Sequence, residues 1–194
     1  MDLDPSEMAL MNTLCSLQKK LRQQTYKKYK RINPFFEDLC DWKERGQFWA
    51  NESNVTIYNS VTICGDVNIG NNTWIGSYVN LDGTGGLFIG EFCSIASGAQ
   101  LLSHDTVAWA LTGGKSKYTY SPTTIGDRCF IGTHAVITKG VVIGNESIVC
   151  AGAVVTKSFP SNSILAGVPA KKIGETVVCP QTFDLKCVYS SLKA

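Results

Sequence analysis

The sequence lacks a long apolar run and carries little net charge. No stretch approaches the roughly 20 consecutive apolar residues of a transmembrane helix, and the first residues, MDLDPSEMALMN, lack the basic and then apolar order of a secretory signal. We therefore expect a cytoplasmic protein. The 194 residues are 44 % hydrophobic and have a net charge of +2. The chain can thus bury a core, and no nucleic-acid partner is predicted because such partners usually require a strongly basic face.

The sequence also lacks the cysteine and histidine spacings that are typical of metal-binding sites. The eight cysteines form no CxxC pair, and histidine occurs only at His104 and His134. Structural zinc sites usually use paired cysteines or cysteine and histidine together. The sequence therefore predicts free thiols and no metal.

A branched apolar residue recurs at every sixth position in three stretches. These residues are Ile57, Ile63, Ile69, Ile75 and Leu81; Ile89, Ile95, Leu101 and Val107; and Ile125, Ile131, Ile137, Ile143, Val149 and Val155. A helix repeats its buried positions at about 3.6 residues and a strand at about 2, so neither explains a period of six. The pattern is typical of a parallel β-helix, in which each face of a triangular prism takes six residues. About five coils fit between residues 55 and 160.

A small residue often follows four positions after the apolar one. These small residues are Thr73, Cys93, Ala99, Cys129, Ala135, Ser147 and Ala153. A thiol behaves as a compact apolar group in such a position. We therefore expect Cys93 and Cys129 to lie in the core.

The first 50 residues have a different pattern. Asp4, Pro5 and Glu7 form a helix-capping signature, and Leu10, Leu14, Leu17 and Leu21 follow at helical spacing, which predicts a short amphipathic helix. Residues 19–31 hold seven basic side chains. This run is explained by a solvated helix face or by an anionic partner, such as a peripheral membrane contact or a phosphate-bearing substrate.

The repeat is interrupted at residues 108–124, directly after the sequence LLSHD. The interrupting loop contains Trp109, Tyr118 and Tyr120, and insertions in repeat proteins tend to line the binding face. His104 lies at the edge of this loop and is a candidate for proton transfer near neutral pH. Asp105, its neighbour in sequence, is a candidate to orient the imidazole.

The regular coils, the sequence AGAVVTKSFPSNSILAGVPAKKI and a histidine before a long loop resemble the hexapeptide acyltransferases. The resemblance covers about residues 50–174 and is strongest to the branch that includes maltose, galactoside and lipopolysaccharide-sugar O-acetyltransferases. It implies an all-β solenoid, the left-handed parallel β-helix, assembled as a homotrimer with active sites between subunits. We divide the chain into an N-terminal helical segment (1–50), the β-helix domain (51–174) and a C-terminal tail (175–194).

The resemblance also implies roles for individual residues. In such relatives the histidine before the loop is the general base, which corresponds to His104. Acceptor binding is expected from Asn80, Asp82 and Trp109. Coenzyme A is expected along the later coils, with its pantetheine near Thr133 and Ala153 and its nucleotide end near Thr156, Lys157 and Lys171. The co-substrate implied is acetyl-CoA.

The function predicted is acetyl-CoA-dependent O-acetylation of a sugar hydroxyl, in the biosynthesis of a surface polysaccharide or lipopolysaccharide. N-acetylation of a nucleotide-linked amino sugar is the alternative, since the same coils and base would serve an amine. A non-catalytic β-helix scaffold has no need of a histidine beside an aromatic loop. The γ-class carbonic anhydrases share this prism but need three histidine ligands for zinc. This chain has two histidines, so another type of ligand would have to replace the third.

Overall fold

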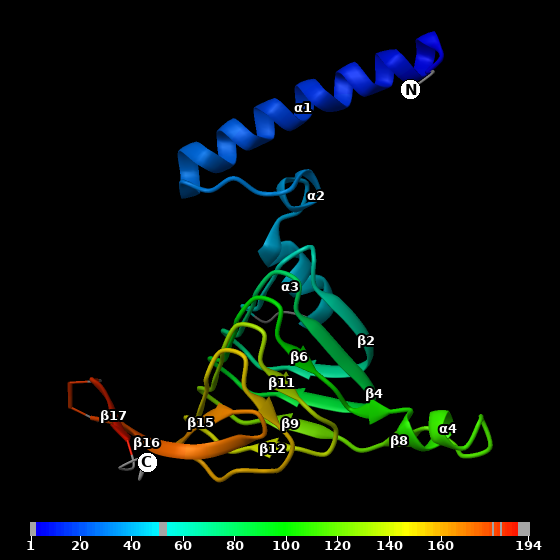
Figure 1. Ribbon diagram of the computed structural model, residues 1–194. Coiled ribbons are helices and arrows are strands. Elements are labelled where there is room, and N and C mark those ends of the chain that lie inside the picture. The colour runs from blue at the N-terminus through cyan, green and yellow to red at the C-terminus, as the bar shows by residue number, and fades with distance from the viewer. Residues whose placement is uncertain (1–2, 51–53, 180, 183, 190–194) are drawn as a thin grey trace. The chain divides into compact units, whose positions relative to one another are not determined.

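The computed structural model describes residues 3–50, 54–179, 181–182 and 184–189. The chain forms two compact units, Met1–Asp41 and Trp42–Ala194. The first unit contains helix α1 (Pro5–Tyr29) and the short helix α2 (Phe35–Asp38) (Figure 1). The second unit contains the remaining elements and the candidate site.

Helix α1 begins with the predicted capping box. The Asp4 carboxylate accepts from the N–H groups of Ser6 and Glu7 at 2.7 and 3.0 Å, and the Glu7 carboxylate accepts from the Asp4 N–H at 2.9 Å. The prediction of a short helix was wrong, because the helix continues through the basic residues to a left-handed cap at Lys30, whose φ is 54°. No residue of α1 is buried. No described helix is both long enough and apolar enough to cross a membrane.

Helix α3 (Trp42–Ala50) packs on the first coil of the β-helix. The Arg45 guanidinium donates to the carbonyls of Tyr58 and Val61, and the Trp49 indole N–H donates to the carbonyl of Val67 at 3.0 Å. A Cβ on Gly46 would lie 1.9 Å from the Val55 carbonyl oxygen, so only glycine permits this approach. The helix thereby covers the end of a repeat stack, which needs a cap.

The strands form the three faces of a parallel prism (Figure 1). The first face stacks β1 (Thr56–Ile57), β3 (Trp74–Ile75), β5 (Ser94–Ile95), β10 (Phe130–Ile131), β13 (Ile148–Val149) and β15 (Ser163–Gly167). The second face stacks the first halves of β2 (Thr62–Ile69) and β4 (Asn80–Ile89) with β6 (Gln100–Leu101), β11 (Val136–Ile137) and β14 (Val154–Val155). The third stacks the second halves of β2 and β4 with β9 (Thr123–Ile125) and β12 (Val142–Ile143).

The residues of the six-residue period stack in register and form the core. On the first face these are Ile57, Ile75, Ile95, Ile131 and Val149. Leu165 lies outside the period but continues the stack, and each of the six has 0 % of its surface exposed. Complete burial of such a side chain contributes about 1.5–3 kcal/mol. The predicted hexapeptide-repeat left-handed β-helix is confirmed. Its first face has one strand more than the five coils expected, because β15 lies beyond residue 160.

The small-residue positions also lie inside the prism. Cys93 and Cys129 are each 2 % exposed and donate to the carbonyls of Gly126 and Gly144 at 3.0 and 3.3 Å. All eight cysteines are free thiols. Cys93 and Cys129 thus serve as compact core groups, as predicted.

The chain leaves the prism after β6. It forms β7 (His104–Asp105), the one-turn helix α4 (Val107–Leu111) and β8 (Thr119–Tyr120), which pairs antiparallel with β7. Val107 is therefore not a core position of the repeat, as its spacing suggested, but a residue of the loop with 58 % of its surface exposed. The period of six resumes with β9.

The C-terminal residues form a hairpin that the repeat pattern did not predict. Strand β16 (Ala170–Val178) pairs antiparallel with β15, and β17 (Leu185–Tyr189) pairs antiparallel with β16. Strand β16 runs across residues 174 and 175, where we divided the β-helix domain from the tail. The hairpin extends the sheet of the first face past the last coil.

Candidate active site

His104 and Asp82 meet at the point where the loop leaves the prism. The His104 Nδ1 atom lies 2.5 Å from the Asp82 Oδ2 atom and 2.9 Å from the Thr84 hydroxyl oxygen. The Asp82 side chain is 3 % exposed and that of His104 is 34 % exposed. The carboxylate is thus enclosed by the protein, while the imidazole reaches solvent.

A bulge in β4 brings Thr84 into this cluster. Strands β2 and β4 pair in register up to Gly65 and Gly83, and the register then shifts by two residues before Val67 pairs with Leu87. The bulge lies between Leu81 and Ile89, where two residues more than the period of six separate the first stretch of the repeat from the second. Bulges redirect side chains and recur beside active sites.

The hydrogen bonds determine which imidazole nitrogen carries the proton. The ionised Asp82 carboxylate can only accept, so the Thr84 hydroxyl, 2.6 Å from Asp82 Oδ1, donates its one hydrogen there. The His104 Nδ1 atom then faces two acceptors and must carry the hydrogen itself. The Nε2 atom keeps its lone pair, and no described residue hydrogen-bonds to it. This imidazole is ready to accept a proton at Nε2.

Asp82 is held in its ionised form. Burial raises the pKa of its carboxyl group, but the Thr84 hydroxyl, the N–H groups of Ser103 and Thr84, and His104 all hydrogen-bond to the carboxylate and together hold the pKa well below its usual range. The N–H groups of Ser103 and Thr84 lie 3.0 Å from Oδ2 and Oδ1. The sequence led us to expect that Asp82 contacts the acceptor. In the structure its side chain is buried and both carboxylate oxygens have partners within the protein.

Asp105 holds the loop and does not contact the imidazole. Its carboxylate accepts from the Val107 N–H at 3.1 Å and the Thr119 hydroxyl at 3.0 Å, and it pairs with Lys139 at 3.3 Å. Successive side chains of a strand point to opposite sides, so the sequence neighbour of His104 faces away from the ring. The suggestion that Asp105 orients the imidazole was wrong.

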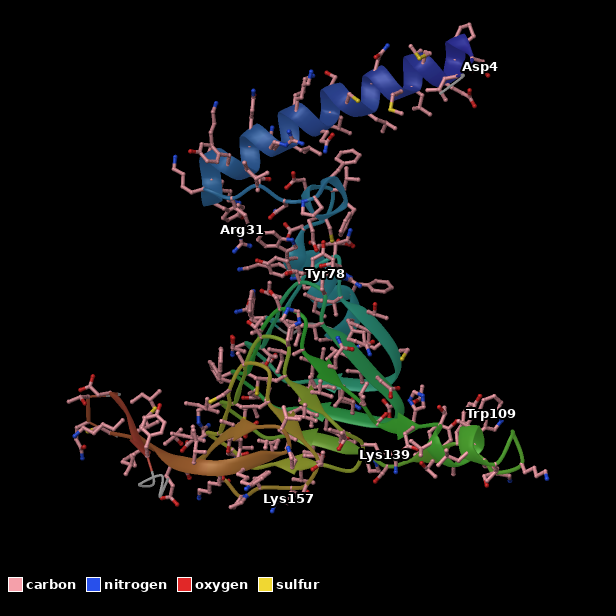
Figure 2. All side chains as sticks on the ribbon, in the orientation of Figure 1. Asp4, Arg31, Tyr78, Trp109, Lys139 and Lys157 are labelled. Carbon is pink, nitrogen blue, oxygen red and sulfur yellow. The ribbon has the colours of Figure 1, made fainter. Side chains whose placement is uncertain are left out.

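The loop carries a shallow aromatic cavity, open to solvent, next to the base. The cavity has a volume of about 560 Å³ and is lined by Trp109, Gly114, Lys115, Ser116, Lys117, Tyr118 and Tyr120. The Tyr120 ring stacks on His104 with a centroid distance of 6.0 Å, and Trp109 meets Tyr118 edge to face at 5.7 Å. Figure 2 shows Trp109 on the loop that extends from the prism. The β7–β8 hairpin thus links Trp109, which contacts Tyr118, to His104, which contacts Tyr120.

Asn80 lies on the second face, in register with Gln100. Its side chain is partly exposed and has no hydrogen-bond partner among the described residues. Its role in acceptor binding stays a prediction.

The residues expected to bind coenzyme A lie on later coils. The ladder of the second face aligns Asn80 with Gln100, Val136 and Val154, so Thr156 lies about 14 Å along the prism from Asp82 at about 4.8 Å per coil. Thr133, Thr156, Lys157 and Lys171 are exposed (Lys157 in Figure 2). Ala153 is buried, and its N–H and carbonyl bond to Cys150 and Val136, which leaves it no free polar group.

Thr84 and Ser103 were not identified from the sequence. Thr84 lies two residues after Asp82 and donates its N–H to that carboxylate, the local turn that aspartate commonly makes. That Asp-x-Thr spacing was a usable signal. Ser103 contributes a backbone N–H, which no residue type would reveal.

Comparison with known proteins supports the fold and the family. A sequence profile described as the hexapeptide repeat of succinyl-transferase matches residues 122–157. The chain is 36 % identical over 128 residues to galactoside O-acetyltransferase of Escherichia coli (strain K12), covering 66 % of this chain and 51 % of that protein. It is 34 % identical over 128 residues to the putative colanic acid biosynthesis acetyltransferase WcaF of the same organism, covering 64 % of this chain and 68 % of that protein. The chain thus spans about half the length of the first relative.

Solved structures share the coil architecture. AntD, an N-acyltransferase from Bacillus cereus solved with dTDP and 3-hydroxybutyryl-CoA, has a TM-score of 0.57 at 26 % identity and covers 62 % of this chain and 69 % of its own. A maltose O-acetyltransferase from Clostridium difficile 630 has a TM-score of 0.57 at 23 % identity, over 86 % of this chain and 88 % of its own, which supports the fold alone. Given its identity with WcaF over two thirds of that protein, the chain belongs to the hexapeptide-repeat acyltransferase family.

Proposed function

We propose that the protein transfers an acetyl group from acetyl-CoA to a hydroxyl group of a sugar, with His104 as the general base. The observation that carries the proposal is the His104 imidazole, which Asp82 and Thr84 hold in the tautomer whose Nε2 atom accepts a proton. Asn80 and Trp109 are the acceptor-binding residues. Asp82 acts through His104 as a positioning residue.

Acetyl-CoA supplies the acyl group in activated form, as a thioester. His104 Nε2 takes the proton of the acceptor hydroxyl as its oxygen forms the new bond to the acyl carbon. The imidazolium so formed is stabilised by the adjacent Asp82 carboxylate. When the carbon–sulfur bond breaks, His104 returns the proton to the leaving sulfur, and the products are an acetyl ester and a free thiol. No protein nucleophile is needed.

The names of the relatives support a sugar acceptor. Galactoside O-acetyltransferase modifies a galactoside by name, and WcaF is named as a putative colanic acid biosynthesis acetyltransferase. In line with the resemblance to sugar O-acetyltransferases, the proposed role is in the biosynthesis of a surface polysaccharide or lipopolysaccharide.

An amine acceptor is the second candidate. AntD is named as an N-acyltransferase and was solved with dTDP, which favours a nucleotide-linked amino sugar. The same Nε2 atom would take the proton of an attacking amine.

A thiol-release assay tests the proposed function. The full chain is incubated with acetyl-CoA and a panel of sugars, nucleotide sugars and amino sugars, and free coenzyme A is measured. Hydroxylamine treatment then distinguishes the products, because it cleaves an acetyl ester and leaves an amide. Release with hydroxyl acceptors and a labile product supports the proposal, whereas a stable product from an amine acceptor alone replaces it with the second candidate. No acceptor-dependent release would exclude both.

Lys157 and Lys171 are proposed to bind the phosphates of coenzyme A. Neither lysine pairs with a carboxylate among the described residues, and both are exposed, so their charges are available to a ligand. We expect Lys157→Ala with Lys171→Ala to raise the KM for acetyl-CoA by about 10-fold or more with little change in kcat, because such contacts are the same in ground and transition states. The same variant should lose much less activity with acetyl-pantetheine as the donor, because that donor lacks the nucleotide phosphates. Equal losses with both donors would remove these lysines from the phosphate site.

A homotrimer is the proposed assembly. Large apolar side chains are exposed on the walls of the prism, including Phe88, Phe130 and Val142 at 44–47 % of their surface. Phe88 and Val142 both pair with Thr124, so they flank it on the third face, one strand to each side. Exposed apolar surface of this kind marks interaction sites, and copies of the same chain would bury it with cyclic symmetry. Multi-angle light scattering should give three chain masses, and an active monomer would contradict the assembly.

A further inference from the structure

The loop cavity beside His104 differs in charge from the rest of this region. Residues 106–126 contain Lys115 and Lys117 and no aspartate or glutamate. Both lysines line the cavity, and neither pairs with a carboxylate among the described residues. The cavity therefore carries two uncompensated positive charges.

The neighbouring charges do not neutralise this pair. Lys139 is paired with Asp105 at 3.3 Å, so the charges of these two residues cancel at the base of the loop. Asp82 is buried and faces His104. An anion in the cavity thus meets Lys115 and Lys117 without a competing carboxylate from the site.

The cavity lies beside the proposed base, because one of its lining residues pairs with His104. Strand β8 pairs with β7, which places Tyr120 opposite His104, and Tyr120 is also a wall of the cavity. Trp109 and Tyr118, whose rings meet edge to face, also line the cavity. Such surface holds an apolar face of a ligand, while a few polar groups fix its orientation. A ligand that packs against Tyr120 would therefore lie near the imidazole on which that ring stacks.

We propose that the acceptor is an anionic sugar, whose carboxylate or phosphate group binds Lys115 and Lys117 in the loop cavity while its hydroxyl reaches His104. This inference rests on the proposed function and specifies the acceptor class for that site. Charge-assisted hydrogen bonds from lysine to a carboxylate or phosphate are about twice as strong as neutral ones. The aromatic residues position the ring, and the lysines select for charge.

The test compares matched ligands by calorimetric binding in the presence of saturating coenzyme A, which occupies the other phosphate-binding residues. The probes are a neutral methyl hexoside, the corresponding hexuronic acid and the hexose 1-phosphate. We expect the anionic probes to bind at least 10-fold more tightly than the neutral one. Tighter binding of the acid alone identifies a carboxylate acceptor, and tighter binding of the phosphate alone identifies a phosphorylated or nucleotide-linked one.

The double variant Lys115→Gln, Lys117→Gln should weaken binding of the anionic probes by about 10- to 100-fold and leave the neutral probe unchanged. The variant Lys43→Gln, Lys186→Gln removes the same charge from exposed positions of α3 and β17 and should change none of the three affinities. Neutral and anionic probes that bind alike in the wild type, or a loss in the Lys115 and Lys117 variant that is equal for all probes, would overturn the proposal.

Turnover separates this inference from the proposed function. Acetyl transfer without a preference for charged acceptors would refute the anionic acceptor and leave the transferase standing. Lysine-dependent binding of the anionic probes without any coenzyme A release would support the cavity as an anionic-sugar site and refute the transferase.

Discussion

His104→Ala should lower kcat by about 10²-fold or more and leave the KM for acetyl-CoA nearly unchanged. The variant removes the proposed proton acceptor, and general base catalysis typically contributes 10²- to 10⁴-fold. Coenzyme A is proposed to bind on the later coils, some 14 Å along the prism, so its affinity does not depend on the imidazole. Steady-state kinetics with both substrates varied measure the two effects separately.

The matched control is His134→Ala. His134 is exposed in the turn that joins β10 to β11 and is not part of the loop, and its substitution should change kcat little. In the wild type kcat/KM should fall at acidic pH, because a protonated imidazole has no lone pair to accept a proton, and this decrease should be absent in the His104 variant. Retention of most of the activity by His104→Ala, or a larger loss in His134→Ala, would show that His104 is not the base.

Asp82→Asn should lower kcat by roughly 10²- to 10⁴-fold, although Asp82 does not touch the acceptor in the proposed mechanism. The amide has nearly the same shape as the carboxylate, but its NH₂ group can donate to His104 Nδ1. The proton then moves to Nε2, where it blocks the proposed base. The KM for acetyl-CoA should change little. A variant with normal kcat would contradict the positioning role.

The tautomer itself can be measured. Because the chain has two histidines, ¹⁵N chemical shifts of the imidazole rings are assigned by comparison with His134→Ala. We expect His104 to carry hydrogen on Nδ1 in the wild type and on Nε2 in Asp82→Asn. Thr84→Ser keeps the hydroxyl group and should preserve the wild-type tautomer. A loss of activity without a change of tautomer would indicate that Asp82 has a purely structural role.

The same substitution has a consequence for stability. The pKa of Asp82 is lower in the folded protein than in the unfolded chain, so its stabilisation is present above about pH 3.9, the reference value for aspartate, and is lost as the pH falls through the folded pKa. In Asp82→Asn, one of the backbone N–H groups of Ser103 and Thr84 faces an NH₂ group and loses its acceptor. We expect the free energy of unfolding at neutral pH to fall by about 1–3 kcal/mol, as measured by urea denaturation.

The period of six was sufficient to predict the β-helix. Each coil places one branched residue on each face, and register between coils follows once these residues stack, as Ile57, Ile75 and Ile95 do. The helix cap at Asp4 could also be predicted, because its hydrogen bonds join residues close in sequence. The C-terminal hairpin could not, since β16 and β17 pair through the backbone and show no repeat.

The same distinction holds for the candidate site, where some features follow from the sequence and others only from the tertiary structure. The sequence by itself determined the coil architecture, the family and the histidine at the edge of the loop, since each follows from local spacing or from matching residues. Only the tertiary structure decided that Asp82 holds the imidazole and that Asp105 holds the loop. Asp82 and His104 are 22 residues apart and meet because one coil stacks on the next beside the bulge in β4. Asp105 adjoins His104 in sequence but points away from it, because neighbouring side chains on a strand face opposite sides.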